Sequence, residues 1–432
     1  MKRKYVILSD RMGLRETLIN LGDRVLTEGF CSLVRDQMDG EVVSAGWKMF
    51  PYINSKSLSG EVQPDDIIEV FDRYVHYVLK FSAGRISFEK TIRELLNSKY
   101  VLKSSLGNAF EGKFKTKFSR GLFETLMPYL LKADYANRFI KSVKTADVAI
   151  YNGAGLLSDH LKHYMVSGLF ECYLAKKLNK KVVTVNQTVD VTHPLATNAI
   201  KVIYLQLDMH VMREPLSADR LISLGIPAEK VIVSCDSAFA APYDSQQNVE
   251  AIAVAEGISK GDICLIIRGD RAQNIVLWSK AIERIRAHYN KNVWVMSTCL
   301  IQDNNVVCDL KGKCEFYTLS KMYDYPETKE LMRYFDVVVT DRYHAAIFSI
   351  LSHTPIVPIS PQTIKMDGLF RSFDYPVKPI ACLSEDNYEE FIKNFDLIYN
   401  SKDALRQRLK DIALMLVEKV KHDYKQLREV IE

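Results

Sequence analysis

The 432-residue sequence has no hydrophobic run of the length that crosses a membrane. A spanning helix needs about 20 mostly apolar residues, and no window approaches that. At the start, MKRKYVILSD offers only Tyr5–Leu8 as an apolar stretch, which is shorter than the roughly 7 to 15 residues of a signal-peptide core. These absences favour a cytoplasmic protein, and they leave peripheral contact with the inner face of a membrane open.

Regularly spaced cysteines and an excess of one charge are also missing. The eight cysteines are scattered without a C-x-x-C pair, so we expect reduced thiols in the core, and neither disulfides nor a metal site. The 58 Lys and Arg nearly balance the 53 Asp and Glu, which leaves a net charge of +5. That balance argues against nucleic acid as a partner.

What the sequence does contain is a repeated alternation of apolar strands and helices. With 47% hydrophobic residues the chain has enough material for two cores. The polar segment 242–248 separates two such runs. We therefore predict an α/β protein of two doubly wound, Rossmann-like domains that face each other across a cleft, the architecture called GT-B among sugar-transferring enzymes. The expected parts are an acceptor-side domain at 1–241 with a helical insertion at about 62–142, a donor-side domain at 249–400, and an amphipathic helix at 401–432.

The most informative segment runs from Asp336 to Phe370. Val337–Val339 is β-branched and uncharged, as in a buried parallel strand, and it leads through Arg342 and His344 into an apolar helix. A second strand, Ile356–Ile359, is followed by Lys365. Ligands of open α/β sheets bind at the carboxyl ends of strands, so two cations and a histidine there predict a site for an anionic small molecule. The alternative is structural: Arg342 pairs with Asp341 or another carboxylate, and His344 caps the helix.

Other strand ends carry candidate binding residues. The strand Asp262–Ile267 ends at Arg268 and Asp270, and the strand at 147–150 leads into the turn of Gly153 and Gly155, where backbone can approach a ligand closely. Near the start, Asp23 is either the N-cap or an acid of the first turn of a helix.

In order and spacing these pieces resemble the polysaccharide pyruvyltransferase family across most of the chain, apart from the insertion and the last helix. The resemblance rests on Asn20-x-Gly22-Asp23, Asn152-Gly-Ala-Gly155-Leu156, Arg213-Glu214-x-x-Ser217 with Leu224-Gly225, Asp236-x-Ala238-Phe239, Arg268, Arg342-x-His344-Ala345, Lys365 and Gly368. Two pieces depart from the family pattern: its Arg-Leu-His reads Arg-Tyr-His here, and its three glycines read Gly-Ala-Gly.

The resemblance implies a GT-B enzyme that moves a pyruvyl group from phosphoenolpyruvate to a sugar of a cell-surface polysaccharide or its precursor, usually closing a cyclic ketal. By that resemblance Arg268, Arg342 and His344 contact phosphoenolpyruvate, which is the donor substrate, and no cofactor is implied. The acceptor is a saccharide, and whether it is lipid-linked stays open.

The residues fit this chemistry on their own terms. Arginine suits both the carboxylate and the phosphate of the donor, so we expect Arg342, Lys365 and Arg268 to neutralise them. His344 is the expected proton donor or acceptor. We also count Asp270, Gly153, Gly155 and Asp23 as substrate-binding. Asp270 and Asp236 are the nearest candidates for a base, with a turn or capping role as the alternative for each.

Two other functions remain open from sequence. A GT-B glycosyltransferase with a nucleotide-sugar donor needs an acidic residue for the ribose beside a glycine-rich turn, and the second domain shows none in an obvious place. A non-catalytic carbohydrate-binding protein of the same fold would have no need of Arg268, Arg342, His344 and Lys365 at a sheet edge.

Overall fold

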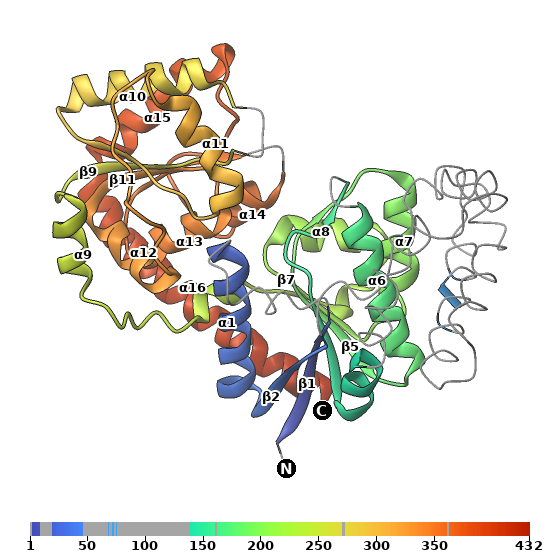
Figure 1. The fold of residues 1–432 in the computed structure, drawn as a ribbon. Coiled ribbons are helices and arrows are strands. Elements are labelled where there is room, and N and C mark those ends of the chain that lie inside the picture. Colours follow the sequence, from blue (N-terminus) through green and yellow to red (C-terminus); the bar gives the residue numbers. More distant parts are fainter. Residues whose placement is uncertain are drawn as a thin grey trace, which may run out of the picture.

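Two parallel sheets, each covered by helices, form the framework of the protein in a computed structural model (Figure 1). The structure describes residues 2–8, 20–45, 68, 71, 72, 75, 138–159, 162–269, 273–360 and 363–432. We call the first sheet with its helices the N-terminal lobe and the second sheet with its helices the C-terminal lobe.

The sheet of the N-terminal lobe has six parallel strands in the order β2-β1-β3-β5-β7-β8. Its strands are β1 (Arg3–Leu8), β2 (Gly40–Ser44), β3 (Val148–Asn152), β5 (Lys181–Gln187), β7 (Met209–Met212) and β8 (Val231–Val233). Its helices are α1 (Leu21–Gln37), α6 (Lys162–Lys177), α7 (Pro194–Tyr204), α8 (Pro215–Ser223), and the 3-10 helices η3 (Ala228–Lys230) and η4 (Ser237–Ala240). Strands β4 (Leu157–Ser158) and β6 (Val189–Asp190) pair separately. The central strands read as unbroken apolar runs because both faces are covered.

The sheet of the C-terminal lobe has five strands in the order β10-β9-β11-β12-β13. The strands are β9 (Asp262–Ile266), β10 (Val293–Val295), β11 (Phe335–Thr340), β12 (Ile356–Ser360) and β13 (Ile380–Ala381). The helices are α9 (Val249–Glu256), α10 (Ile275–Tyr289), α11 (Leu300–Leu310), α12 (Tyr325–Leu331), α13 (Tyr343–Leu351), α14 (Lys365–Arg371) and α15 (Tyr388–Asn400), with the 3-10 helices η5 (Met332–Tyr334) and η6 (Glu385–Asn387). Since β9, β11 and β12 are neighbours, the residues that follow them meet at one edge.

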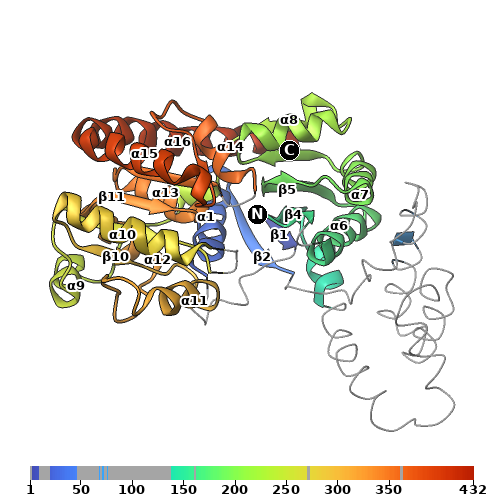
Figure 2. The ribbon, with the colours of Figure 1, turned by 90° about the horizontal axis from the view of Figure 1, so that it is seen from above.

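The last helix, α16 (Lys402–Ile431), joins the two lobes (Figures 1 and 2). At its start Arg406 donates a hydrogen bond to the Phe335 carbonyl of β11, and further along Lys419 donates to the Val233 carbonyl of β8. Its apolar face, Leu409, Ile412, Leu416, Val420, Tyr424 and Leu427, belongs to one hydrophobic core with residues of both sheets. The helix therefore packs on its own protein, and the chain ends beside β1.

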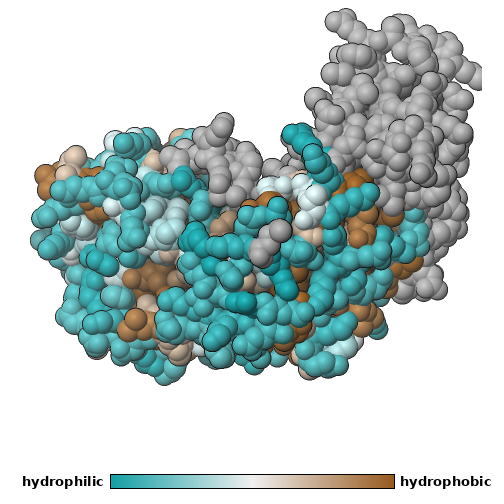
Figure 3. Space-filling view, turned by 90° about the horizontal axis from the view of Figure 1, so that it is seen from below, coloured by the Kyte–Doolittle hydropathy of each residue, from teal (hydrophilic) through white to brown (hydrophobic). Residues whose placement is uncertain are grey.

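The predicted architecture of two Rossmann-like α/β units is confirmed. Most of the expected helical insertion at 62–142 lies outside the described residues. Within the described ranges, no helix has the length and apolar character needed to cross a membrane. The face shown in Figure 3 is mostly hydrophilic, with small separate apolar patches.

Candidate active site

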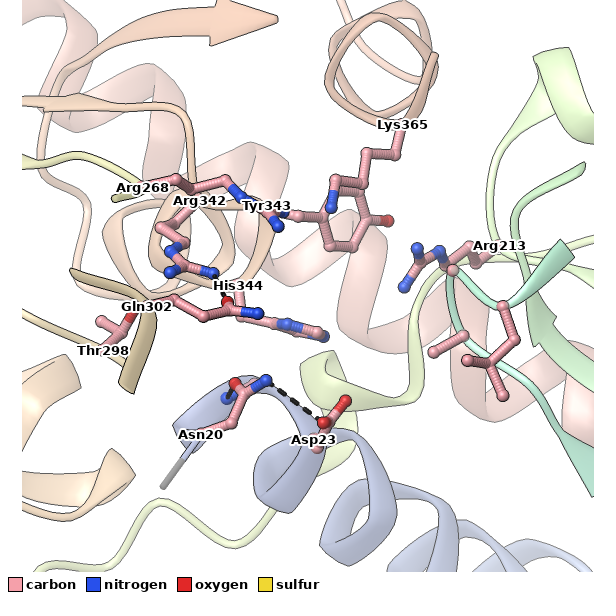
Figure 4. Close-up of a pocket in the computed structure, with 14 residues that line it drawn as sticks. Asn20, Asp23, Arg213, Arg268, Thr298, Gln302, Arg342, Tyr343, His344 and Lys365 are labelled. Atoms are coloured by element: carbon pink, nitrogen blue, oxygen red, sulfur yellow. Dashed lines mark hydrogen bonds between the residues drawn. The ribbon is translucent and has the colours of Figure 1, made fainter. Parts of the chain in front are cut away.

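A cavity of about 320 Å³ opens between the carboxyl ends of the two sheets. This volume is at the small end of the roughly 300 to 1,000 Å³ that small-molecule sites occupy. The C-terminal lobe lines it with Arg268, Thr298, Gln302, Arg342, Tyr343, His344 and Lys365, and the N-terminal lobe with Asn20, Gly22, Asp23, Ala154, Gly155, Leu156 and Arg213 (Figure 4). Six of the predicted site residues therefore come together here: Arg268, Arg342, His344, Lys365, Asp23 and Gly155. Gly153 packs against Gln187 instead, and Asp270 lies outside the described residues.

Arg342 stands at the N-cap of α13, directly after β11. Its Nη1 donates to Gln302 Oε1 at 2.7 Å, and its Nη2 forms an ion pair with the buried carboxylate of Asp303. Asp303 also accepts hydrogen bonds from the backbone of Thr298 and Cys299 at the start of α11. The structural alternative is thus right for Arg342, which pairs with another carboxylate, Asp303. It is wrong for His344, because the N-cap of α13 is Arg342 itself. The pair fixes the guanidinium while leaving other N–H donors for a ligand, because arginine has five.

Asp341 holds the loop that carries Arg268. The buried carboxylate accepts from the Arg268 backbone N–H at 2.8 Å and from the Gln273 side chain at 3.0 Å. Gln273 in turn bonds the Arg268 carbonyl and Trp278. Burial raises the pKa of Asp341 to about 6. This small network turns the chain at the end of β9 so that Arg268 enters the cavity beside Arg342.

His344 lies in the first turn of α13, with its ring against the start of α1. A Cβ on Gly22 would lie 2.2 Å from His344 Nδ1, so only glycine leaves room for the ring at this distance. On the other side, Nε2 is 3.8 Å from Asp236 Oδ2, longer than a hydrogen bond. The His344 side chain is 16% exposed. The imidazole is therefore placed in the cavity by packing between the two lobes.

Arg213 also lines the cavity, and the sequence analysis quoted it for the family resemblance without predicting it as a site residue. It follows β7, and its Nη1 donates to Asp236 at 2.8 Å while its Nε donates to Thr188 at 2.9 Å. The guanidinium carbon lies 4.3 Å from the centre of the Tyr343 ring, within range of a cation–π interaction. Burial would raise the pKa of Asp236, but His344 and Arg213 outweigh it and lower the pKa to about 2. The strand-end rule that found Arg342 also applies to Arg213.

The start of α1 supplies the opposite wall. Asn20 is the N-cap and accepts from the Gly22 N–H, while its Nδ2 donates to Asp23 Oδ2 at 3.1 Å. Asp23 is accordingly a first-turn acid and not the cap. The Leu21 N–H donates to the Thr298 carbonyl of the C-terminal lobe at 3.0 Å. The helix start is thereby fixed between the lobes.

The turn after β3 and helix α14 complete the cavity. Ala154, where the family pattern has glycine, adopts a left-handed φ of 48°, a conformation in which a Cβ is unfavourable. Lys365 begins α14, and Gly368 one turn later meets Glu214 so closely that a Cβ would lie 2.3 Å from its Oε2. This contact brings the lobes together next to Lys365. Among the residues that the structure describes, no group of His, Cys, Asp and Glu is placed to hold a metal ion.

Comparisons of the fold reveal sugar-nucleotide enzymes of the GT-B type. HepE of Anabaena, solved with UDP and glucose, has a TM-score of 0.54 and 10% identity over 99% of this chain and 100% of its own. UDP-GlcNAc 2-epimerase of Neisseria meningitidis, bound to UDP-GlcNAc, has a TM-score of 0.52 and 10% identity over 100% and 99% of the two chains. At such identity the likeness shows the fold alone. No curated protein is significantly similar in sequence.

The sequence itself matches a family model. The model of the polysaccharide pyruvyl transferase family matches residues 61–363, most of the chain. That range contains Arg213, Arg268, Arg342 and His344, which line the cavity, and it ends two residues before Lys365. The chain therefore belongs to the polysaccharide pyruvyl transferase family.

Proposed function

We propose that this protein transfers the pyruvyl group of phosphoenolpyruvate to a saccharide of a polysaccharide or its precursor, and closes a ketal across two hydroxyls. The observation that carries the proposal is the meeting of Arg268, Arg342 and Lys365 with Arg213 across one small cavity, with His344 between them (Figure 4). Phosphoenolpyruvate carries a phosphate and a carboxylate on three carbons, and guanidinium groups bind both in paired hydrogen bonds.

The arginines are oriented before a ligand arrives. Asp303 holds Arg342 and Asp236 holds Arg213, each from behind the cavity wall. Donors that are already oriented need little reorganisation during reaction, which is the main source of electrostatic stabilisation in enzymes. Lys365 is a first-turn residue of α14 and adds a more mobile charge.

His344 is the proton donor in this proposal. Protonation of the methylene carbon of phosphoenolpyruvate makes the neighbouring carbon electrophilic, and a sugar hydroxyl attacks there. Loss of phosphate and attack by a second hydroxyl then close the ketal. Of the two protons that the hydroxyls release, one restores the acid that formed the new methyl group and one leaves with phosphate. Acid–base assistance of this kind is worth about 10² to 10⁴ in rate.

The test is calorimetric titration with phosphoenolpyruvate, UDP-glucose and UDP-GlcNAc. We expect phosphoenolpyruvate to bind, and Arg342→Ala to weaken it by roughly 10- to 100-fold, since charge-assisted hydrogen bonds contribute about 1.5–3 kcal/mol. Arg342→Lys keeps a partner for Asp303 but loses the planar fork, so it separates binding from folding. Arg284→Ala, at an exposed pair with Glu389, is the control.

A nucleotide sugar that binds where phosphoenolpyruvate does not would overturn the proposal. That outcome would favour a glycosyltransferase, in line with the UDP-binding proteins that share the fold. A lipid-linked acceptor and contact with a membrane surface remain predictions that this titration does not address.

A further inference from the structure

Pyruvyl transfer needs a group that takes the proton of the attacking hydroxyl. Of the two carboxylates that the sequence offered, Asp236 is poorly suited. Asp236 is fully buried, and its two oxygens already accept hydrogen bonds from Arg213 and from the Ala238 N–H. Its pKa of about 2 also makes it a weak base. Its capping bond to Ala238, at the start of η4, agrees with the structural alternative. Asp270 lies outside the described residues.

Asp23 has the position that Asp236 lacks. It is the only carboxylate among the cavity-lining residues that the structure describes. The other charged residues that line the described cavity are Arg213, Arg268, Arg342 and Lys365. The negative charge of Asp23 repels the phosphate and the carboxylate of the donor, so its side of the cavity does not suit them. An uncharged polyol that donates hydrogen bonds is the complementary ligand for this side, because a carboxylate only accepts them.

A chain of two hydrogen bonds orients the Asp23 carboxylate. Asn20 Nδ2 donates to its Oδ2 at 3.1 Å, and Asn20 is itself held by the Gly22 N–H at 3.0 Å. The His344 ring packs against Gly22, the residue next to Asp23. In Figure 4 the Asp23 and Asn20 side chains lie below the His344 ring, on the side away from Lys365. His344, the proposed proton donor, and the Asp23 carboxylate thus lie at the same end of the cavity.

We propose that Asp23 is the general base for the acceptor, accepting the proton of the sugar hydroxyl that attacks the pyruvyl carbon, with Asn20 as its positioning residue. The inference rests on the proposed function. In the step, the oxygen–hydrogen bond of the hydroxyl breaks, the proton goes to Asp23, and the oxygen pair forms the new bond to carbon 2. That proton then replaces the one that His344 gave to carbon 3, so the two residues end the step as they began.

The experiment follows phosphate release from phosphoenolpyruvate with a panel of methyl hexopyranosides that have a free 4,6-diol, and with water as the acceptor in their absence. Calorimetry with phosphoenolpyruvate alone is done in parallel. We expect Asp23→Asn to bind phosphoenolpyruvate within about twofold of wild type and to lose turnover by roughly 10² to 10⁴-fold. We expect added formate to restore part of the activity of Asp23→Ala, since a small carboxylate can enter the vacated space.

Asp36→Asn is the matched control, because Asp36 lies on the same helix but at its far end, where it pairs with Arg35. It should leave binding and turnover unchanged. Turnover of Asp23→Asn near the wild-type level, or no gain from formate with Asp23→Ala, would overturn the role of Asp23 alone. A wild-type protein that neither binds phosphoenolpyruvate nor releases phosphate would overturn the proposed function, and this inference with it.

Discussion

Gly22 is the residue whose replacement separates function from stability most clearly. Its missing Cβ leaves the space that His344 occupies. In Gly22→Ala the ring must move, and displacement of a catalytic group by about 1 Å costs roughly 10² in rate. Stability should change little, since the preference for alanine over glycine in helices, at most about 1 kcal/mol, offsets part of the cost of moving one side chain. Turnover and urea unfolding measured together check this.

Gly29 provides the contrast on the same helix. A Cβ there would lie 1.9 Å from the backbone oxygen of Ser237, and backbone cannot rotate away as a side chain can. Gly29→Ala should therefore lose stability, whereas Gly22→Ala should not. A destabilised Gly22→Ala with normal activity per folded molecule would contradict the assignment of that space to His344.

A second residue-scale prediction concerns pH. Burial lowers the pKa of His210 to about 3, and its ring bonds Thr184 and the Tyr204 carbonyl. The folded imidazole stays neutral, while the unfolded one binds a proton below about pH 6.5. The unfolded state thus gains protons as pH falls, and stability decreases.

Between pH 7 and pH 5 this costs about 2 kcal/mol, because one pKa unit equals about 1.4 kcal/mol. His210→Gln should remove that loss, although it is less stable at pH 7. Urea unfolding of both proteins at pH 7 and pH 5 gives the free energy of unfolding that each one loses. Asp341, with its pKa raised to about 6, binds a proton in the folded state over the same range and so opposes the loss. This contribution is the same in both proteins and cancels when they are compared. Equal losses in the two proteins would show that His210 does not titrate as described.

At the scale of elements, the contact between α14 and α8 controls the position of Lys365. Gly368 of α14 touches Glu214, whose carboxylate caps α8 through the Ser217 N–H at 3.0 Å and has little freedom to move. Gly368→Ala should therefore push α14 away and weaken phosphoenolpyruvate binding about tenfold, with the fold retained. The shorter Glu214→Asp, which is still a good N-cap, should restore part of the affinity in the double variant. Additive effects in that double-mutant cycle would contradict the contact.

The order of strands and helices makes one part of the site predictable from the sequence and leaves another part unpredictable. The positions of Arg268, Arg342 and Lys365 follow from strand ends alone, since parallel strands place their carboxyl ends at one edge. The partner of Arg342 does not follow, because Asp303 lies on α11, a helix about 40 residues earlier that follows a different strand. Nor does the approach of α1 to Thr298, which depends on how the lobes meet.

For the whole molecule, α16 makes the two lobes one unit. Tyr424 on this helix is buried against Phe30 of the N-terminal lobe, whereas Trp278 and Trp294 lie in the C-terminal lobe. Tyr424→Ala should cost about 3–5 kcal/mol. The third tryptophan, Trp47, lies outside the described residues and is replaced by phenylalanine, so that only the two tryptophans of the C-terminal lobe fluoresce. Tryptophan fluorescence and circular dichroism should then report the same lowered midpoint of unfolding. A midpoint of fluorescence that does not change would mean that the lobes unfold independently.

The most direct test of the central claim is transfer from phosphoenolpyruvate labelled with carbon-13 at carbon 2, with the same panel of methyl hexopyranosides. The account predicts that the label appears as a ketal carbon in the saccharide, with one phosphate released for each pyruvyl group transferred, and that Arg342→Ala abolishes both. Label that stays in phosphoenolpyruvate, while UDP-glucose or UDP-GlcNAc donates its sugar to the same acceptors, would contradict it.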